Sequence, residues 1–225
     1  TGNELANILT GNGSDNTLNG AGGNDTLNGG AGADTLDGGI GNDSLGGGLG
    51  HDFDFVDSTG DRVTENLNEG IDTVASSVDY TLGANLDNLV LSGTALLGTG
   101  NGLANTITGT GNNNTLSGIL GNDALDGGAG NDSLNGGANL DTLLGGAGVD
   151  TLAGGADNDL LVGGNDNDIL VGGLGRDTIV YANGDGTDQV TGFVIGATTG
   201  DFLSFSGFTE LDVVIVTTAT VANTQ

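Results

Sequence analysis

Residues 127–153 read GGAGNDSLN, GGANLDTLL and GGAGVDTLA, three nine-residue units in direct succession. Each unit begins with glycine, has aspartate in sixth place and has leucine in eighth place. The same division continues without insertion over residues 100–180, and another array of such units covers residues 2–55. Because these positions stay in register over so many units, the sequence is a tandem repeat and not merely a chain rich in glycine and aspartate.

The residue types of one unit predict its local structure. Places one to six hold glycine, asparagine and aspartate, which tolerate turns and left-handed conformations. Asn139, Asp157 and Asp166 replace glycine in fourth place and are expected to keep that conformation. Places seven to nine are long enough only for a very short strand. Since one unit cannot bury its leucine alone, we expect two units to form a flattened coil and coils to stack into two parallel sheets. The predicted fold is all-β, a parallel β-roll or β-solenoid with leucines inside.

The aspartates in sixth place indicate a metal. Equivalent residues of alternate units occupy the same edge of neighbouring coils, so these carboxylates would stack about 4.8 Å apart and repel one another. The chain has no lysine to separate them, whereas calcium suits a site of carboxylates and turn carbonyls. The predicted calcium ligands are Asp25, Asp34, Asp43, Asp52, Asp123, Asp132, Asp141, Asp150, Asp159, Asp168 and Asp177. Their same-edge pairs give seven sites, and pairs that contain Asn7, Asn16, Asn105 or Asn114 add up to four weaker ones.

Composition excludes several classes of protein. Of 225 residues, 48 are glycine and none is proline or cysteine, which excludes collagen, disulfide-stapled domains and thiol catalysis. The formal charge of −28 opposes binding to nucleic acid and to anionic membranes, and no apolar run is long enough for a transmembrane segment. A generic acidic surface would mix Asp with Glu, but 26 of the 30 acidic residues are Asp and 11 of those share one phase of the repeat.

The arrays predict four segments: a first β-roll array at 1–55, a β-rich solenoid connector at 56–99, a second β-roll array at 100–180 and a C-terminal capping β-segment at 181–225. The first array fails at Asp54, which stands where an aliphatic residue belongs, so we expect the chain to change register and leave the array there. Short alternating runs in the connector predict strands, arranged as rungs longer than those of the nonapeptide coils.

The C-terminal segment is richer in aromatic residues, with Phe193, Phe202, Phe205 and Phe208 close together. Strands around Asp188-Gln189-Val190 and Asp201-Phe202-Leu203 are expected to provide a hydrophobic cap for the last coil. The run Val213–Val216 is strongly β-prone and would form an open sheet edge.

Four units match G-G-x-G-x-D-x-(aliphatic) in full, and they start at Gly29, Gly38, Gly127 and Gly145. The pattern resembles the RTX (repeats-in-toxin), haemolysin-type calcium-binding nonapeptide repeat of large RTX adhesins and of RTX modules in secreted enzymes. The resemblance implies a parallel β-roll with calcium in its turns. It also implies bacterial type I secretion to the cell surface or the extracellular medium.

No catalytic motif accompanies the repeats. His51 is the only histidine and occupies a variable fifth place, so we expect no enzyme activity and no cofactor other than calcium. Two functions remain open: a calcium-hardened structural β-roll of an adhesin, S-layer or extracellular matrix filament, and the C-terminal folding and secretion module of a lipase, protease or alginate epimerase. The sequence begins inside a repeat, which predicts that it is a piece of a longer tandem protein. Together with the edge at Val213–Val216, this predicts head-to-tail association into filaments when calcium is present.

Overall fold

The computed structural model describes residues 1–182, 184–195, 200–206, 215–216 and 219–221. All regular elements in these residues are β-strands, so the described residues hold no helix that could cross a membrane. The chain divides into two compact units, Thr1–Thr106 and Ile107–Gln225. The finer division into four segments stays a prediction.

The first unit consists of parallel strands. They are β1 (Ile8–Thr10), β2 (Thr17–Asn19), β3 (Thr26–Ala31), β4 (Thr35–Asp37), β5 (Ser44–Leu49), β6 (Phe53–Val56), β7 (Arg62–Val63), β8 (Thr73–Ser76), β9 (Tyr80–Thr81), β10 (Asn88–Leu91) and β11 (Leu97–Thr99). Hydrogen-bonded neighbours follow the orders β1-β3-β5-β7, β2-β4-β6-β8-β10 and β9-β11. Odd and even strands therefore alternate between two sheets, as expected when each coil contributes one strand to each sheet.

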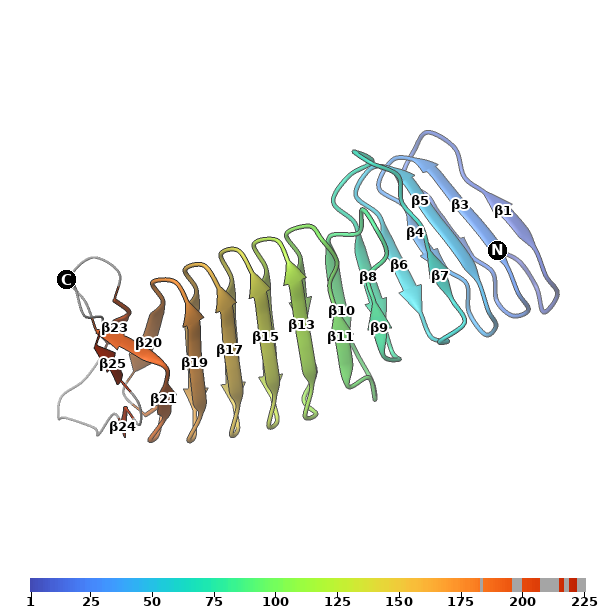
Figure 1. The fold of residues 1–225 in the computed structure, drawn as a ribbon. Helices are drawn as coiled ribbons and strands as arrows, with labels where there is room; N and C mark the ends of the chain where they lie inside the picture. The colour runs from blue at the N-terminus through green and yellow to red at the C-terminus, as the bar shows by residue number, and fades with distance from the viewer. Residues whose placement is uncertain (183, 196–199, 207–214, 217–218, 222–225) are drawn as a thin grey trace. The chain divides into compact units, whose positions relative to one another are not determined.

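The second unit continues the same alternation. Its strands are β12 (Thr106–Thr108), which begins at the boundary, β13 (Thr115–Leu120), β14 (Ala124–Ala129), β15 (Ser133–Ala138), β16 (Thr142–Ala147), β17 (Thr151–Ala156), β18 (Leu160–Asn165), β19 (Ile169–Leu174), β20 (Thr178–Ala182), β21 (Gln189–Thr191), β22 (Phe193–Ile195), β23 (Phe202–Ser206), β24 (Ile215–Val216) and β25 (Ala219–Val221). The orders are β12-β14-β16-β18-β20-β23, β13-β15-β17-β19-β21-β24 and β22-β25. Figure 1 shows β13, β15, β17 and β19 side by side.

Leucines in eighth place form the core of the coils. Each strand of the array pairs with the strand two nonapeptide units further along, so Leu134 lies opposite Leu152 and Leu143 opposite Leu161. These four side chains are at most 1% exposed. The prediction of a parallel β-roll, with two nonapeptides per coil and leucines inside, is therefore confirmed.

The strands of the arrays are longer than the sequence suggested. Most strands of the second array have six residues, because the two glycines and the residue after them continue the ladder. Gly137 pairs with Gly155, and Ala138 pairs with Ala156. Glycine in second place adopts positive φ, 113° at Gly137, which lets the strand run on without a side-chain clash. The prediction of three-residue strands is wrong for this reason.

Residues that replace glycine keep its conformation. Asn139, Asp157 and Asp166 in fourth place have φ of 80°, 73° and 80°, as expected. Ile119, in second place, has φ of 82°. A β-branched residue rarely adopts such a backbone conformation, so Ile119 is a strained position in the array.

The chain does not change register at Asp54, and that expectation was wrong. Strand β6 pairs with β4 in the array register, with Asp54 opposite Leu36. On its other side Asp54 lies opposite Val74 of β8. Its side chain takes the place of the leucine and is fully buried. Backbone pairing therefore carries the solenoid past the interruption, because ladder hydrogen bonds do not depend on which side chain points inward.

The connector is a solenoid, as expected, but its rungs are not uniformly longer. Phe53 of β6 lies opposite Thr73 of β8, a step longer than two nonapeptides. Thr73 in turn lies opposite Asn88 of β10, a step shorter than two nonapeptides. Val74 and Leu89 remain fully buried in register with one another. Variation in length is absorbed by the turns between strands, since the strands alone form the ladder.

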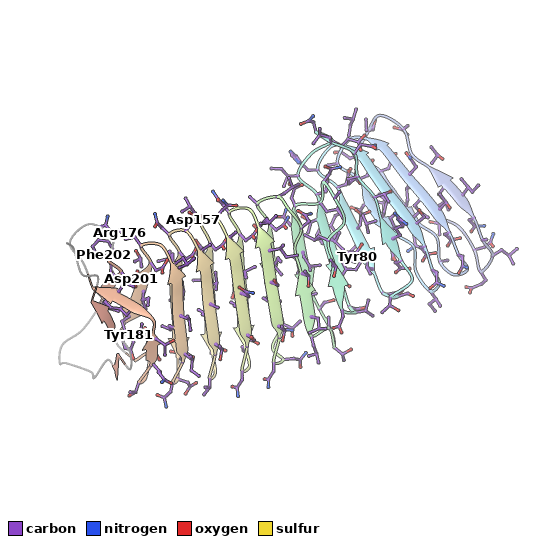
Figure 2. All side chains as sticks on the ribbon, viewed as in Figure 1. Tyr80, Asp157, Arg176, Tyr181, Asp201 and Phe202 are labelled. Carbon is purple, nitrogen blue, oxygen red and sulfur yellow. The ribbon has the colours of Figure 1, made fainter. Side chains whose placement is uncertain are left out.

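The C-terminal residues extend the array. β21 pairs with β19, and β23 pairs with β20, so both add strands in parallel register. Phe202 is on the outer face, 45% exposed, with Arg176 stacked 3.9 Å from its ring centre (Figure 2). The expected hydrophobic cap is therefore not built by Phe202. Phe208 and residues 213–214 lie outside the described residues, as does the side chain of Phe205; β24 lies at the end of its sheet in the described part of the chain.

Candidate metal centre

The predicted ligands all lie in one structural position. Each aspartate stands at the end of a turn, two residues before a residue in eighth place whose side chain points inward. All eleven carboxylate-bearing residues are at most 3% exposed. A buried aspartate needs hydrogen bonds or a cation, because an isolated buried charge is unfavourable by several kcal/mol.

Apart from Asp123, each of these aspartates uses one carboxylate oxygen to accept a backbone N–H from the preceding coil. The backbone N–H of Asp132 donates to Asp150 Oδ1 at 2.7 Å, and the N–H of Asp150 donates to Asp168 Oδ1 at 2.8 Å. On the opposite edge, Asp141 N–H donates to Asp159 at 2.9 Å. In the first unit Asp25 N–H donates to Asp43 at 2.7 Å. The stacked carboxylates thus form continuous ladders in which each aspartate links two coils.

In most of the ladder aspartates, the second carboxylate oxygen has no hydrogen bond to the described residues. Among the described residues, these buried Oδ2 atoms have no partner within the chain. They belong to Asp25, Asp34, Asp43, Asp52, Asp72, Asp132, Asp141, Asp150, Asp159, Asp168, Asp177 and Asp188. So many equivalent orphaned oxygens indicate a ligand that repeats with the coil, since native proteins leave few buried polar atoms unsatisfied.

Glycine in first place makes room for these oxygens. A Cβ atom on Gly145 would lie 2.4 Å from Asp150 Oδ2 and 2.4 Å from the carbonyl oxygen of Gly163 in the next coil. At Gly127 the corresponding distances are 2.4 Å to Asp132 Oδ2 and 2.7 Å to the Gly145 carbonyl. A carboxylate oxygen and a backbone carbonyl therefore converge on one small space in successive coils. Such a set of hard oxygens is the donor chemistry that calcium prefers.

Backbone oxygens must supply part of the coordination. No group of three or more His, Cys, Asp or Glu side chains is placed to hold a metal ion in the part of the chain that the structure describes. The aspartates are stacked in single file, so a cation between two coils meets at most two of their carboxylates. The eleven residues fit calcium as paired carboxylates combined with turn carbonyls, and this ligand set stays a prediction.

The pKa values of the ladder aspartates show that their ionised carboxylates are unfavourable when no cation is bound. Burial raises the pKa of Asp141 and Asp150 to about 6, and that of Asp159 and Asp168 to about 7. The N–H bond from the preceding coil lowers each pKa, and the charges of neighbouring ladder carboxylates raise it again. At neutral pH the ionised ladder is unfavourable in a metal-free coil, and a divalent cation reverses this balance.

The asparagine coils are built differently. Asn7 Oδ1 accepts the N–H of Asn3 at 2.7 Å, so the side chain closes its own turn. Asn105 Oδ1 accepts the N–H of Asn101 in the same way. The Asn105 amide also donates to the carbonyl oxygens of Leu86 and Asp87, both at 3.0 Å. The side-chain amide of Asn105 thus provides hydrogen-bond donors at a position where an aspartate carboxylate provides only acceptors.

Sequence reasoning missed five aspartates that continue the ladders. They are Asp61, Asp72, Asp87, Asp188 and Asp201, and they accept N–H bonds of 2.9–3.0 Å from Asp43, Asp52, Asp72, Asp168 and Asp177, respectively. Asp61 lies in the nonapeptide phase, nine residues after Asp52, in a unit that begins with Val56 instead of glycine, and the other four lie outside that phase. Each nevertheless stands two residues before an aliphatic residue in a strand, and this Asp-x-aliphatic triplet is the signal that could have found them.

His51 takes part in the backbone framework. Its Nδ1 accepts the N–H of Ile71 at 2.9 Å, and its side chain is exposed. This hydrogen bond holds the turn before Asp72 and agrees with a structural role for His51.

Parallel coils with ladders of buried aspartate at their turns define the class of calcium-binding β-solenoids. Comparison with protein families identifies the chain within this class. The RTX calcium-binding nonapeptide repeat (4 copies) matches residues 1–36, 20–54, 99–134, 117–152 and 144–179, which is more than half of the chain. The chain belongs to this family. A comparison with curated proteins found no match.

Proposed function

We propose that the chain is an extracellular structural β-roll that folds on binding calcium and forms part of an adhesin, S-layer or matrix filament. The observation that carries this proposal is the series of buried Asp Oδ2 atoms that lack a partner among the residues that the structure describes. A formal charge of −28 opposes folding at low calcium, and extracellular modules of this kind bind calcium in the millimolar range. Such a chain would stay unfolded in the bacterial cytoplasm and fold after type I secretion.

The proposal includes no catalytic role for these residues. The ladders are repetitive and buried, so they give rigidity instead of a reactive group open to substrate. A second candidate is the C-terminal RTX folding and secretion module of a lipase, protease or epimerase. Family membership is equally compatible with this alternative, because the repeat resembles RTX modules of secreted enzymes as well as those of adhesins. A catalytic sequence upstream in the same gene would favour it over the filament.

Calcium stoichiometry tests the proposed metal binding. The sequence gives seven same-edge aspartate pairs, and the missed residues add five pairs, which end at Asp61, Asp72, Asp87, Asp188 and Asp201. Calorimetric titration with calcium chloride at pH 7.5 is expected to show at least seven bound ions per chain. One or two ions would contradict the stacked ladders.

Association of the solenoid ends tests the filament. Strands β1 and β2 lie at the ends of their sheets in the first unit and can accept a further parallel strand. Because parallel coil addition is directional, contacts between copies would be head-to-tail and open. Light scattering and electron microscopy should show longer particles with calcium than with chelator. A monomer at high protein and calcium concentrations would exclude the filament and favour the secretion module.

A further inference from the structure

The sheet of odd-numbered strands is interrupted within the first unit. β7 is the last strand of the sheet β1-β3-β5-β7, and β9 begins a separate sheet with β11. The even-numbered strands β2-β4-β6-β8-β10 of the same unit stay hydrogen bonded in unbroken order. Among the described residues, one edge of β7 and one edge of β9 therefore lack a partner strand (Figure 1).

The free edge of β7 presents the backbone of Val63. In a parallel ladder, successive residues of a strand form hydrogen bonds with opposite neighbours. The N–H groups of Arg62 and Thr64 donate to the carbonyl oxygens of Asp43 and Leu45, at 2.8 and 3.0 Å, on the side of β5. The N–H and C=O of Val63, which lies between them, therefore face away from β5.

The free edge of β9 presents the backbone of Thr81. The N–H of Leu82 donates to the carbonyl oxygen of Thr99 at 2.9 Å, on the side of β11. Thr81 lies opposite Thr99 in that ladder and directly precedes Leu82. The N–H and C=O of Thr81 therefore face away from β11, so β7 and β9 each offer one donor and one acceptor at the interruption.

Side chains bridge the two edges in place of a backbone ladder. The Tyr80 hydroxyl accepts the N–H of Val63 at 3.4 Å, which is long for such a bond. The Asn85 amide donates to the carbonyl oxygen of Glu65 at 3.0 Å. A Cβ on Gly83 would lie 3.5 Å from the Val63 carbonyl oxygen. The edges are therefore close beside Gly83 and farther apart at Tyr80, whose side chain spans the space between them.

A cavity of about 600 Å³ lies at this interruption. Its wall consists of residues 59–65, which include β7, and of residues 79–81, 83 and 84, which include β9. We call this cavity the β7–β9 cleft. An extended segment that rises about 3.3 Å per residue needs only a few residues to run along both edges. The cleft is thus the place where one added strand would pair with both sheets.

Charge indicates which kind of segment fits the cleft. Asp61, Glu65 and Asp79 lie in its wall, and Arg62 is the one basic side chain that the described residues place there. The whole chain has a formal charge of −28, with two Lys and Arg residues in all. A strand from a second copy would bring further negative charge, whereas an extended peptide with basic side chains is complementary to this wall.

We propose that the β7–β9 cleft binds an extended peptide with basic side chains, which joins both sheets as an added strand. The peptide backbone pairs with the N–H and C=O groups of Val63 and Thr81, and its basic side chains lie beside Asp61 and Asp79. In this mode of recognition main-chain hydrogen bonds give affinity and the side chains give selectivity. The Tyr80 hydroxyl gives up only a long hydrogen bond when the peptide enters.

Fluorescence anisotropy of a labelled peptide, titrated with the full chain in calcium, tests the proposal. The probe is a short peptide of alternating valine and lysine, for which we expect saturable binding. One control peptide carries N-methyl groups on the valine nitrogens, which remove backbone donors and keep the charge. A second control has glutamate in place of lysine. Neither control peptide should bind.

Substitutions in the chain locate the bound peptide. Thr81→Pro removes an N–H that faces the cleft and keeps the bonds of β9 to β11, because proline is tolerated at a free strand edge. This variant should keep its β signal in calcium and lose peptide binding. Tyr80→Phe removes only the hydroxyl that occupies the Val63 N–H, so it should bind the peptide at least as tightly as the unmodified chain.

A pair of charge variants tests the acidic wall. Asp79→Asn should weaken binding about threefold, as expected for loss of one exposed ion pair. Asp157→Asn removes the same charge from a turn of the second unit, at a φ of 73° that asparagine tolerates, and should leave binding unchanged (Figure 2). Equal weakening in the two variants would contradict a local role for the wall.

Three results would overturn the added strand. Equal binding of the valine–lysine peptide and its N-methylated form would show simple attraction to an acidic surface. Absence of saturable binding, or unchanged binding in a folded Thr81→Pro variant, would exclude the cleft. Light scattering in calcium without peptide should give the same particle size for Thr81→Pro as for the unmodified chain; a smaller particle would assign the cleft to a second copy.

Discussion

The second array and the stretch from Phe53 to Thr99 have different sequences, but both form a ladder of parallel strands with aspartates stacked at the turns. In the array, each strand pairs with the strand two nonapeptides further along, with leucine and glycine facing inward. In the connector one rung is longer than two nonapeptides and the next is shorter, while Asp54 replaces leucine and Glu65 replaces glycine. Asp72 nevertheless accepts the N–H of Asp52, and Asp87 that of Asp72. The Asp-x-aliphatic triplet therefore marks the coils of both regions, with Asp52-Phe53-Asp54 as the exception, and the nine-residue spacing makes successive coils of the array alike.

The largest effect is expected from an aspartate in the middle of an array ladder. Asp150→Ala removes the acceptor for the Asp132 N–H and one orphaned oxygen of a predicted calcium site. We expect a loss of about 3 kcal/mol in the free energy of unfolding in calcium, as for other buried charged hydrogen bonds. Urea unfolding followed by circular dichroism measures this loss. Asp37→Ala, at a half-buried ninth place, is the control and should cost about 1 kcal/mol or less; equal losses in the two variants would argue against a special role for sixth place.

The connector ladder should be nearly as sensitive as the array. Asp72→Ala removes the acceptor for the Asp52 N–H at 2.9 Å and leaves a buried gap beside Val74. If the triplet defines the coil, the free energy of unfolding should fall by about 2–3 kcal/mol. The same urea experiment applies. A loss within 0.5 kcal/mol, roughly that of an ordinary surface substitution, would show that the connector is held by other contacts.

The pH dependence of the metal-free chain follows from the raised pKa values of the ladder. Asp159 and Asp168 have pKa values of about 7 in the folded chain, against roughly 3.9 for an unfolded aspartate. The folded chain binds more protons, so metal-free stability is present at low pH and is lost as pH rises from about 4 to 7. In chelator, the β signal in circular dichroism should be larger at pH 5.0 than at pH 7.5. The opposite order would contradict the ladder electrostatics.

The smallest effect concerns the strained second place of the array. Ile119 adopts φ of 82° with a side chain that is 44% exposed, while the next unit has glycine at this place. Ile119→Gly should raise the free energy of unfolding by about 1 kcal/mol through relief of the left-handed conformation. Thermal unfolding in calcium measures the change. Ile119→Ala keeps a Cβ and should gain less; an equal gain would assign the effect to the exposed side chain.

Much of the fold and of the metal centre follows from the period of the sequence. The parallel β-roll, the buried row at Leu134, Leu143 and Leu152, and the buried aspartates at the turns were all predictable, because a strict repeat forces equivalent environments. The connector was harder to predict, since backbone pairing tolerates Asp54 in a leucine place and turns of different length. Four of the five additional ladder aspartates were missed because the search followed the spacing and not the Asp-x-aliphatic triplet, and Asp61, which keeps the spacing, was missed because its unit lacks glycine in first place.

The most direct test of the calcium ladders is far-UV circular dichroism of the full chain at pH 7.5. With excess chelator the β signal should be lost, because the buried ladder carboxylates are then charged and uncompensated. Addition of calcium chloride to millimolar concentration should restore it, whereas the same concentration of magnesium chloride should not, because magnesium demands a smaller octahedral site and dehydrates reluctantly. A chain that keeps its full β signal in excess chelator would contradict calcium-dependent folding.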